Sequence, residues 1–192
     1  MDEEPKRGTK APSIPAWIDC EDLLVKMREE LLDRAIKLLN SEIEAGHIKV
    51  NGNALFSSES SSDVEQAMYL INNLVDDSGR LHQEYNEYVE RSSSKRLDSK
   101  EAKKFEQLQK FVLFVEQITM LMDYARVLSA WADSASKLTH AHSRDEILKL
   151  TMPASEDRRN VLEFFVNNKD IGKEALTDEE RETLSNVLKD EK

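Results

Sequence analysis

Residues 105–138 read FEQLQKFVLFVEQITMLMDYARVLSAWADSASKL, and this stretch decides the fold. Its apolar residues recur at spacings of three, four and seven, which is the period of an α-helix. They cover nearly every side of that helix and leave only a narrow polar edge. A helix that is apolar on two sides belongs between other helices. The stretch therefore predicts the central helix of an all-α bundle.

The apolar residues of this helix divide into a wide main face, which includes Ile118 and Leu121, and a second line on another side. The main face is wide enough to pack against two neighbouring helices. The second line must also be buried by packing against other segments. In the rest of the chain, only the first helix and a weakly apolar C-terminal segment could pack there. This second line consists of Leu113, Met120, Tyr124, Val127 and Trp131.

Heptad-spaced apolar stripes elsewhere in the sequence predict two more long helices. Asp19 is placed to cap the first of them, and Gly46 supplies a left-handed stop at its end. Gly79 falls inside the second, where it marks a kink or a close helix crossing. The predicted fold is an all-α bundle of three long helices, over about residues 19–45, 63–91 and 100–138, with short C-terminal helices.

The chain of 192 residues reads as a tail followed by one helical domain. Residues 1–16 hold three of the four prolines with mixed charges, and we predict a flexible tail there. Residues 17–192 form the predicted single domain, of which residues 155–192 are a semi-independent C-terminal extension. Ser155 begins one short helix of that extension, and the sequence from Thr177 to Glu180 is a capping box for another.

Charge and cysteine content exclude several classes of function. The formal net charge of −11 opposes binding to nucleic acid, because phosphate backbones are bound mainly by Lys and Arg. Cys20 is the only cysteine, so the chain has no internal disulfide, and we expect a buried free thiol in a reducing compartment. Charged residues interrupt every apolar run, so no transmembrane segment is expected. These features predict a cytoplasmic protein and leave a nuclear location open.

The sequence lacks the usual signatures of an enzyme or a metal protein. It has no Gly-rich phosphate loop and no recognisable nucleophile with its base. His140 and His142 are spaced for zinc, but without a nearby cysteine they fit loop residues better. His82 lies on an apolar stripe, where a hydrogen-bonded structural histidine is the default. We therefore expect no catalytic residues, no bound metal and no cofactor.

Charge is unevenly distributed along the chain. Residues 57–91 sum to −6, whereas residues 92–104 sum to +3 and place Lys95 and Arg96 at the tip of a predicted helical hairpin. This tip fits a solvated loop, a docking point for an acidic partner, or a contact with an anionic membrane surface, which we rank below a protein partner. The SSESSSD run suits acidophilic kinases, although an ordinary solvated linker explains it as well.

These observations favour a non-enzymatic protein interaction module, either an adaptor or a subunit of a larger complex. A partner helix, or a second copy of the chain in a homodimer, is expected to pack in an apolar groove beside Trp131 and the C-terminal helices. A small-ligand or lipid carrier with a cavity between the helices is the alternative. The predicted partner-binding residues are Val127, Trp131, Tyr124, Phe164, Phe165, Leu184, Leu188, Lys95 and Arg96.

Overall fold

The computed structural model describes residues 14–50, 52, 55–140 and 155–190. Within these residues all regular structure is helical, which confirms the all-α fold with long helices. The chain divides into two compact units, and the long helices α1 (Glu21–Glu44) and α4 (Ser99–His140) contribute to both. Unit 1 comprises the chain up to Glu30 and from Arg126 onward, and unit 2 comprises Leu31–Ala125.

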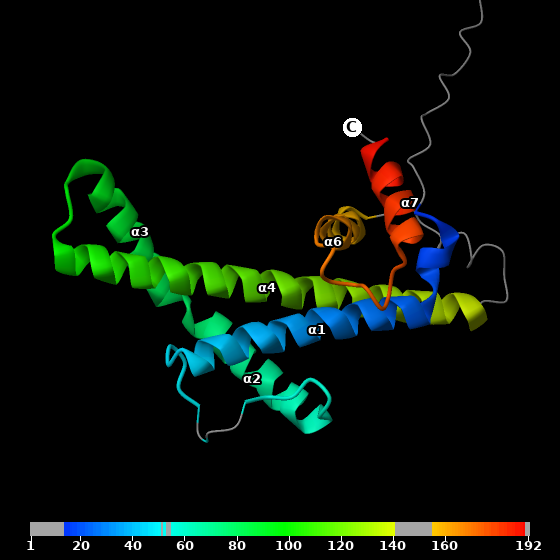
Figure 1. Ribbon diagram of the computed structural model, residues 1–192, viewed down its shortest axis with the longest axis horizontal. Coiled ribbons are helices and arrows are strands. Elements are labelled where there is room, and N and C mark those ends of the chain that lie inside the picture. Colours follow the sequence, from blue (N-terminus) through cyan, green and yellow to red (C-terminus); the bar gives the residue numbers. More distant parts are fainter. Residues whose placement is uncertain (1–13, 51, 53–54, 141–154, 191–192) are drawn as a thin grey trace, which may run out of the picture. The chain divides into compact units, whose positions relative to one another are not determined.

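Unit 2 combines the end of α1 with α2 (Ser61–Asp77), α3 (Gly79–Ser94) and residues 99–125 of α4. Figure 1 shows α3 and the first turns of α4 joined as a hairpin. Tyr85 stacks on Phe105 with ring centroids 5.5 Å apart, and Lys104 pairs with Glu84. The buried residues of this unit include Leu31, Ile36, Leu39, Ala67, Ile71, Tyr88, Leu108, Val112, Val115, Ile118 and Leu121.

The single helix expected over residues 63–91 is two helices, α2 and α3, and that prediction is corrected. The break falls at Ser78, whose hydroxyl donates to the carbonyl of Val75 at 2.7 Å. Such a bond offers the backbone an alternative to the regular helical ladder. Gly79 is the first residue of α3, and a Cβ added there would meet nothing within 4 Å. Gly79 therefore does not mark a close crossing.

The connection between α1 and α2 is fastened to α1 at two points. Gly46 adopts a φ of 76°, as expected for the residue that ends the helix. Further along, the Asn40 side chain donates to the carbonyl of Phe56 at 2.8 Å and accepts from its amide at 3.0 Å. Ser58 donates to a carboxylate oxygen of Asp33 at 2.7 Å. These bonds fix the chain just before α2 begins.

Unit 1 is built from the short 3-10 helix η1 (Ala16–Asp19), the start of α1, the end of α4, α6 (Glu156–Asn167) and α7 (Asp178–Lys189). Ser155 caps α6 as predicted, and Thr177 and Glu180 form the predicted capping box of α7. Buried Arg181 donates to the carbonyls of Phe165 and Ile171 and so joins α7 to the chain that precedes it. The buried residues of this unit include Ile18, Leu24, Met27, Leu128, Trp131, Val161, Leu162, Phe165, Leu176 and Leu184.

Three expectations about the N-terminal part need comment. Helix α1 begins at Glu21, and the Asp19 carboxylate accepts a hydrogen bond from Trp131. Cys20 is exposed, so the prediction of a buried thiol is wrong. The predicted tail falls mostly on residues 1–13, which lie outside the described residues, although Ala16 already belongs to η1.

Candidate functional site

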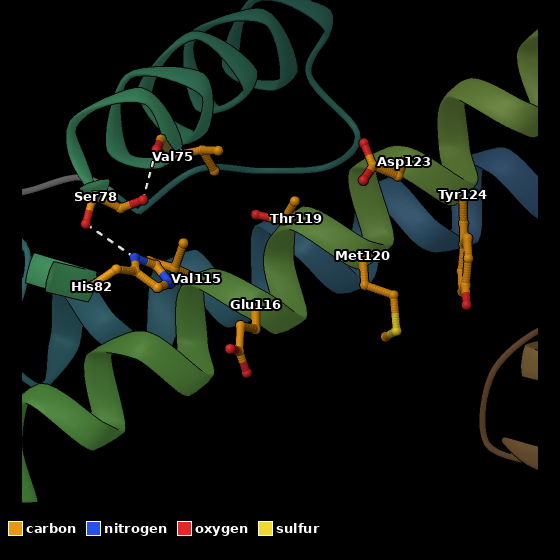
Figure 2. Close-up of a pocket in the computed structure, with 9 residues that line it drawn as sticks. All are labelled: Val75, Ser78, His82, Val115, Glu116, Thr119, Met120, Asp123 and Tyr124. Carbon is orange, nitrogen blue, oxygen red and sulfur yellow. Dashed lines mark hydrogen bonds between the residues drawn. The ribbon is translucent and has the colours of Figure 1, made fainter. Parts of the chain in front are cut away.

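A hollow at which several elements of unit 2 meet lies where α2 and α3 join, against the side of α4. Its volume is about 440 Å³, and it is open to solvent. Helix α2 contributes Val75, α3 contributes His82, and Ser78 comes from the junction itself. We call this hollow the junction groove. Its lining, drawn in Figure 2, consists of Val75, Ser78, His82, Val115, Glu116, Thr119, Met120, Asp123 and Tyr124.

Hydrogen bonds hold the junction end of the groove in place. The carbonyl of Ser78 lies 3.0 Å from both the backbone amide and the Nδ1 atom of His82. Since a carbonyl oxygen only accepts, Nδ1 carries the proton and donates, which leaves Nε2 as the other polar atom of the ring. Ser78 is itself buried, and its hydroxyl is bonded to Val75. The helix break is therefore an ordered element that can form the wall of a binding site.

The α4 side of the groove presents two kinds of side chain. In the view of Figure 2, Met120, Tyr124 and Glu116 extend downward from α4, and Thr119 and Asp123 extend upward. Val115 is buried beneath them, whereas Glu116 and Asp123 are exposed. The groove thus has an apolar floor and carboxylates along its border.

Charged side chains lie in this border and around it. Among the described residues that line the groove there are two carboxylates, Glu116 and Asp123, and neither Lys nor Arg. Two more exposed acids, Asp76 and Asp77, stand between Val75 and Ser78 in the chain. Exposed Arg80 follows Ser78 by two residues, and exposed Arg126 follows Asp123 by three, so side chains of both signs surround the groove.

An exposed apolar line on α4 runs into the groove. Leu113 is 51% exposed, a high value for a large apolar side chain. Met120 and Tyr124 follow it at spacings of seven and eleven residues, so the three lie on one face of the helix, and both are half-buried. Met120 and Tyr124 also line the groove. We call Leu113, Met120 and Tyr124 the α4 apolar line.

The structure separates the residues that the sequence grouped into one partner-binding surface. Trp131 is only 1% exposed, and Phe165 and Leu184 are fully buried within unit 1. The expectation that thin cover leaves Trp131 open is thus corrected, because Asp19 and Arg158 contact it inside the unit. Val127 is half-buried in the same unit.

The remaining predicted residues occupy other places. Phe164 is half-buried and meets Phe165 edge to face at 6.0 Å. Leu188 lines a small hollow of about 200 Å³ between α6 and α7. Lys95 and Arg96 are exposed at the turn between α3 and α4, as the hairpin prediction placed them. Of the predicted partner-binding residues, Tyr124 alone lines the junction groove.

Ser78, Glu116 and Asp123 are groove residues that sequence reasoning did not select. The available signal was Ser78-Gly79, a pair of helix-weakening residues in the middle of a heptad pattern. A helix break at Ser78-Gly79 produces the junction of α2 and α3, and the hollow lies between this junction and α4. His82 was examined as a structural histidine, and its bond to the Ser78 carbonyl agrees with that interpretation.

The described residues contain no group of three or more His, Cys, Asp or Glu side chains that could hold a metal ion. In the part of the chain that the structure covers, no helix is long and apolar enough to cross a membrane. Comparison with known protein families, with curated proteins and with solved structures found no match. The geometry of the junction groove and of the α4 apolar line therefore carries the argument about function.

Proposed function

We propose that this protein is a non-enzymatic interaction module, an adaptor or a subunit of a larger complex, that binds a helix of a partner protein. The observation that carries the proposal is the exposure of Leu113 on the face that it shares with Met120 and Tyr124. Helical peptides bind to such surfaces through apolar anchors one and two turns apart. The junction groove extends the apolar surface beyond the width of one helix.

Burial explains why a partner would bind there. Covering a large apolar side chain that was exposed contributes about 1.5–3 kcal/mol. Met120 is flexible and adapts to the shape of an incoming side chain, and Tyr124 offers a broad surface with a polar tip. These two residues are therefore the expected anchors for binding, with Leu113 extending the contact along α4.

The carrier alternative is less well supported by the same geometry. A volume of about 440 Å³ is within the usual range for small-ligand sites. The groove is open to solvent, however, whereas carriers usually bury most of the ligand surface. Carboxylates at the border would also repel the headgroup of an anionic lipid.

Site-specific photo-crosslinking tests the proposal. The crosslinking amino acid benzoylphenylalanine is placed at position 113 or 120, and the protein is irradiated in an extract of its source cells. Gln107 is exposed on another face of α4, and the same substitution there is the matched control. We expect a discrete crosslinked protein from positions 113 and 120 that position 107 does not give. A product with twice the mass of this chain would identify a second copy as the partner, and identical products from all three positions would contradict the proposal.

A further inference from the structure

We infer that Ser62 is a phosphorylation site for a Ser/Thr protein kinase that selects acceptors followed by carboxylates. This inference does not depend on the proposed function. It concerns the SSESSSD run of residues 57–63, which extends into the first turn of α2. Ser62 is followed directly by Asp63 and, three residues on, by Glu65. Of the five serines in this run, Ser62 alone has an acidic residue at both positions.

The hydrogen bonds of the run also favour Ser62 as the acceptor. Ser57, Ser58 and Ser60 each use the side-chain oxygen in a bond that orders the connection or caps α2. A phosphoryl group on any of these three oxygens would disturb that bond. Ser62 instead accepts from Nε2 of Gln66 at 3.2 Å, and both side chains are exposed. That bond does not use the hydroxyl proton, and a phosphate oxygen accepts from Gln66 equally well.

Charges of both signs lie near Ser62. The Asp63 carboxylate accepts from the amide of Ser57 at 2.9 Å, whereas Glu65 is exposed. Lys49 is exposed and lines the same hollow as Glu65, and in the part of the chain that the structure describes no ion pair joins the two. Residues 55–66 contain neither Lys nor Arg. Glu65 is therefore the carboxylate that we expect to meet the basic side chains of the kinase.

The first turn of α2 opens without exposing the core. Ser62 is exposed, and the first buried residue of α2 is Ala67. The helical ladder begins only at Val64, whose amide donates to the carbonyl of Ser60 at 2.9 Å. Opening of residues 61–65 therefore breaks few bonds, and fraying of a helix end is among the least costly motions of a protein.

The chemistry at Ser62 is an ordinary phosphoryl transfer. The catalytic aspartate of the kinase accepts the hydroxyl proton while Oγ bonds to the γ-phosphorus of ATP, and ADP leaves. The phosphoserine places negative charge at the N-terminal end of α2. The partial positive charge of that helix end offsets the repulsion from Asp63, so we expect the modified chain to keep its helices.

Phosphorylation of the full chain tests the assignment. The protein is incubated with ATP, Mg²⁺ and casein kinase 2, and tandem mass spectrometry locates the phosphoryl group. We expect one phosphoryl group, on Ser62, and Ser62→Ala should lower its incorporation at least tenfold. Ser61→Ala is the matched control, because Ser61 is also exposed but has Val64 three residues on, and this variant should be phosphorylated like the unchanged protein.

Two further variants separate a positional requirement from general attraction to an acidic segment. Glu65→Gln removes the carboxylate three residues after Ser62 and should slow phosphorylation at least tenfold. Glu59→Gln removes an exposed carboxylate three residues before Ser62 and should have little effect. Circular dichroism checks that each variant, and the phosphorylated protein, keeps its helical content.

Each alternative outcome has a defined meaning. A phosphoryl group on another serine of the run, or none on the folded chain, overturns the assignment, as does equal slowing by Glu65→Gln and Glu59→Gln. Loss of helical signal on phosphorylation would overturn it too. Protein isolated from its source cells with phosphatase inhibitors gives the second measurement. Phosphoserine at position 62 supports the inference, and Ser62 found only unmodified contradicts it.

Discussion

The indole Nε1 of Trp131 donates a 2.8 Å hydrogen bond to the carboxylate of Asp19, which lies 112 residues away in the chain. The guanidinium of Arg158 lies 4.8 Å from the centroid of the Trp131 ring. Three segments of unit 1, namely η1, the end of α4 and α6, thus meet at one side chain. Trp131 is for this reason a structural anchor of the unit, and partner binding is expected elsewhere on α4.

The first prediction concerns that hydrogen bond. Asp19→Ala should lower the free energy of unfolding by about 1–3 kcal/mol, because a buried donor loses its partner. Asp19→Asn keeps an acceptor oxygen and should lose clearly less. Chemical denaturation followed by circular dichroism measures both. If the two variants lose the same amount, the bond to Trp131 contributes nothing.

The second prediction concerns Gly172, which has a φ of 77°. A Cβ at this position would lie 2.5 Å from Cδ1 of Phe165, which is fully buried, and the Gly172 amide donates to Glu30. Gly172→Ala should therefore cost about 2–5 kcal/mol, through backbone strain together with overpacking.

Gly46 is the matched control for Gly172. Its φ of 76° is nearly the same, but an added Cβ would meet nothing within 4 Å. Gly46→Ala should cost only the backbone strain, about 1–2 kcal/mol. Thermal unfolding of both variants compares them, and equal losses would show that the contact with Phe165 is not decisive.

Features that depend on nearby residues could be predicted from the sequence. The apolar period indicated α1 and α4, and the Thr177-to-Glu180 pattern indicated the start of α7, because capping is decided within one helical turn. The break at Ser78 was harder to predict. The heptad pattern continues across it, and a side-chain bond of Ser78 to Val75 ends α2 without interrupting that pattern.

The position of the candidate site depends on which α4 side chains are buried by segments distant in the chain, and a single sequence does not reveal those contacts. Leu113 and Trp131 belong to the same line of α4 and are both apolar. One is 51% exposed and the other 1% exposed, because segments distant in the chain cover only Trp131. Periodicity shows which residues share a helix face, but not which part of that face finds a neighbour. The predicted partner-binding residues consequently include Trp131, whose side chain is buried.

The third prediction concerns the carboxylate of Asp33. Burial raises its pKa, but hydrogen bonds from Lys37 and Ser58 and the charge of Lys37 together outweigh burial, so the pKa lies below its ordinary value. A lowered pKa in the folded state contributes stability above the unfolded value of about 3.9. That contribution is lost as the pH falls through the folded pKa. Ser58→Ala removes one of the bonds and should raise the Asp33 pKa, which NMR titration of the carboxyl carbon measures. An unchanged titration midpoint would show that the bond from Ser58 does not hold the carboxylate.

The last prediction compares a buried and an exposed leucine of α4 in unit 2. Leu121 is 3% exposed, and Leu121→Asp should cost more than about 4 kcal/mol, because an unpaired carboxylate would be placed in the core. Leu113 is 51% exposed, so Leu113→Asp should change the free energy of unfolding by less than about 0.5 kcal/mol. Urea denaturation of the two variants measures the difference. The Leu113 variant should keep its helical signal and lose the crosslinked protein obtained from position 120, since the new carboxylate interrupts the α4 apolar line. If Leu113→Asp unfolds unit 2 instead, the leucine is part of the core, and the partner helix must bind on another face.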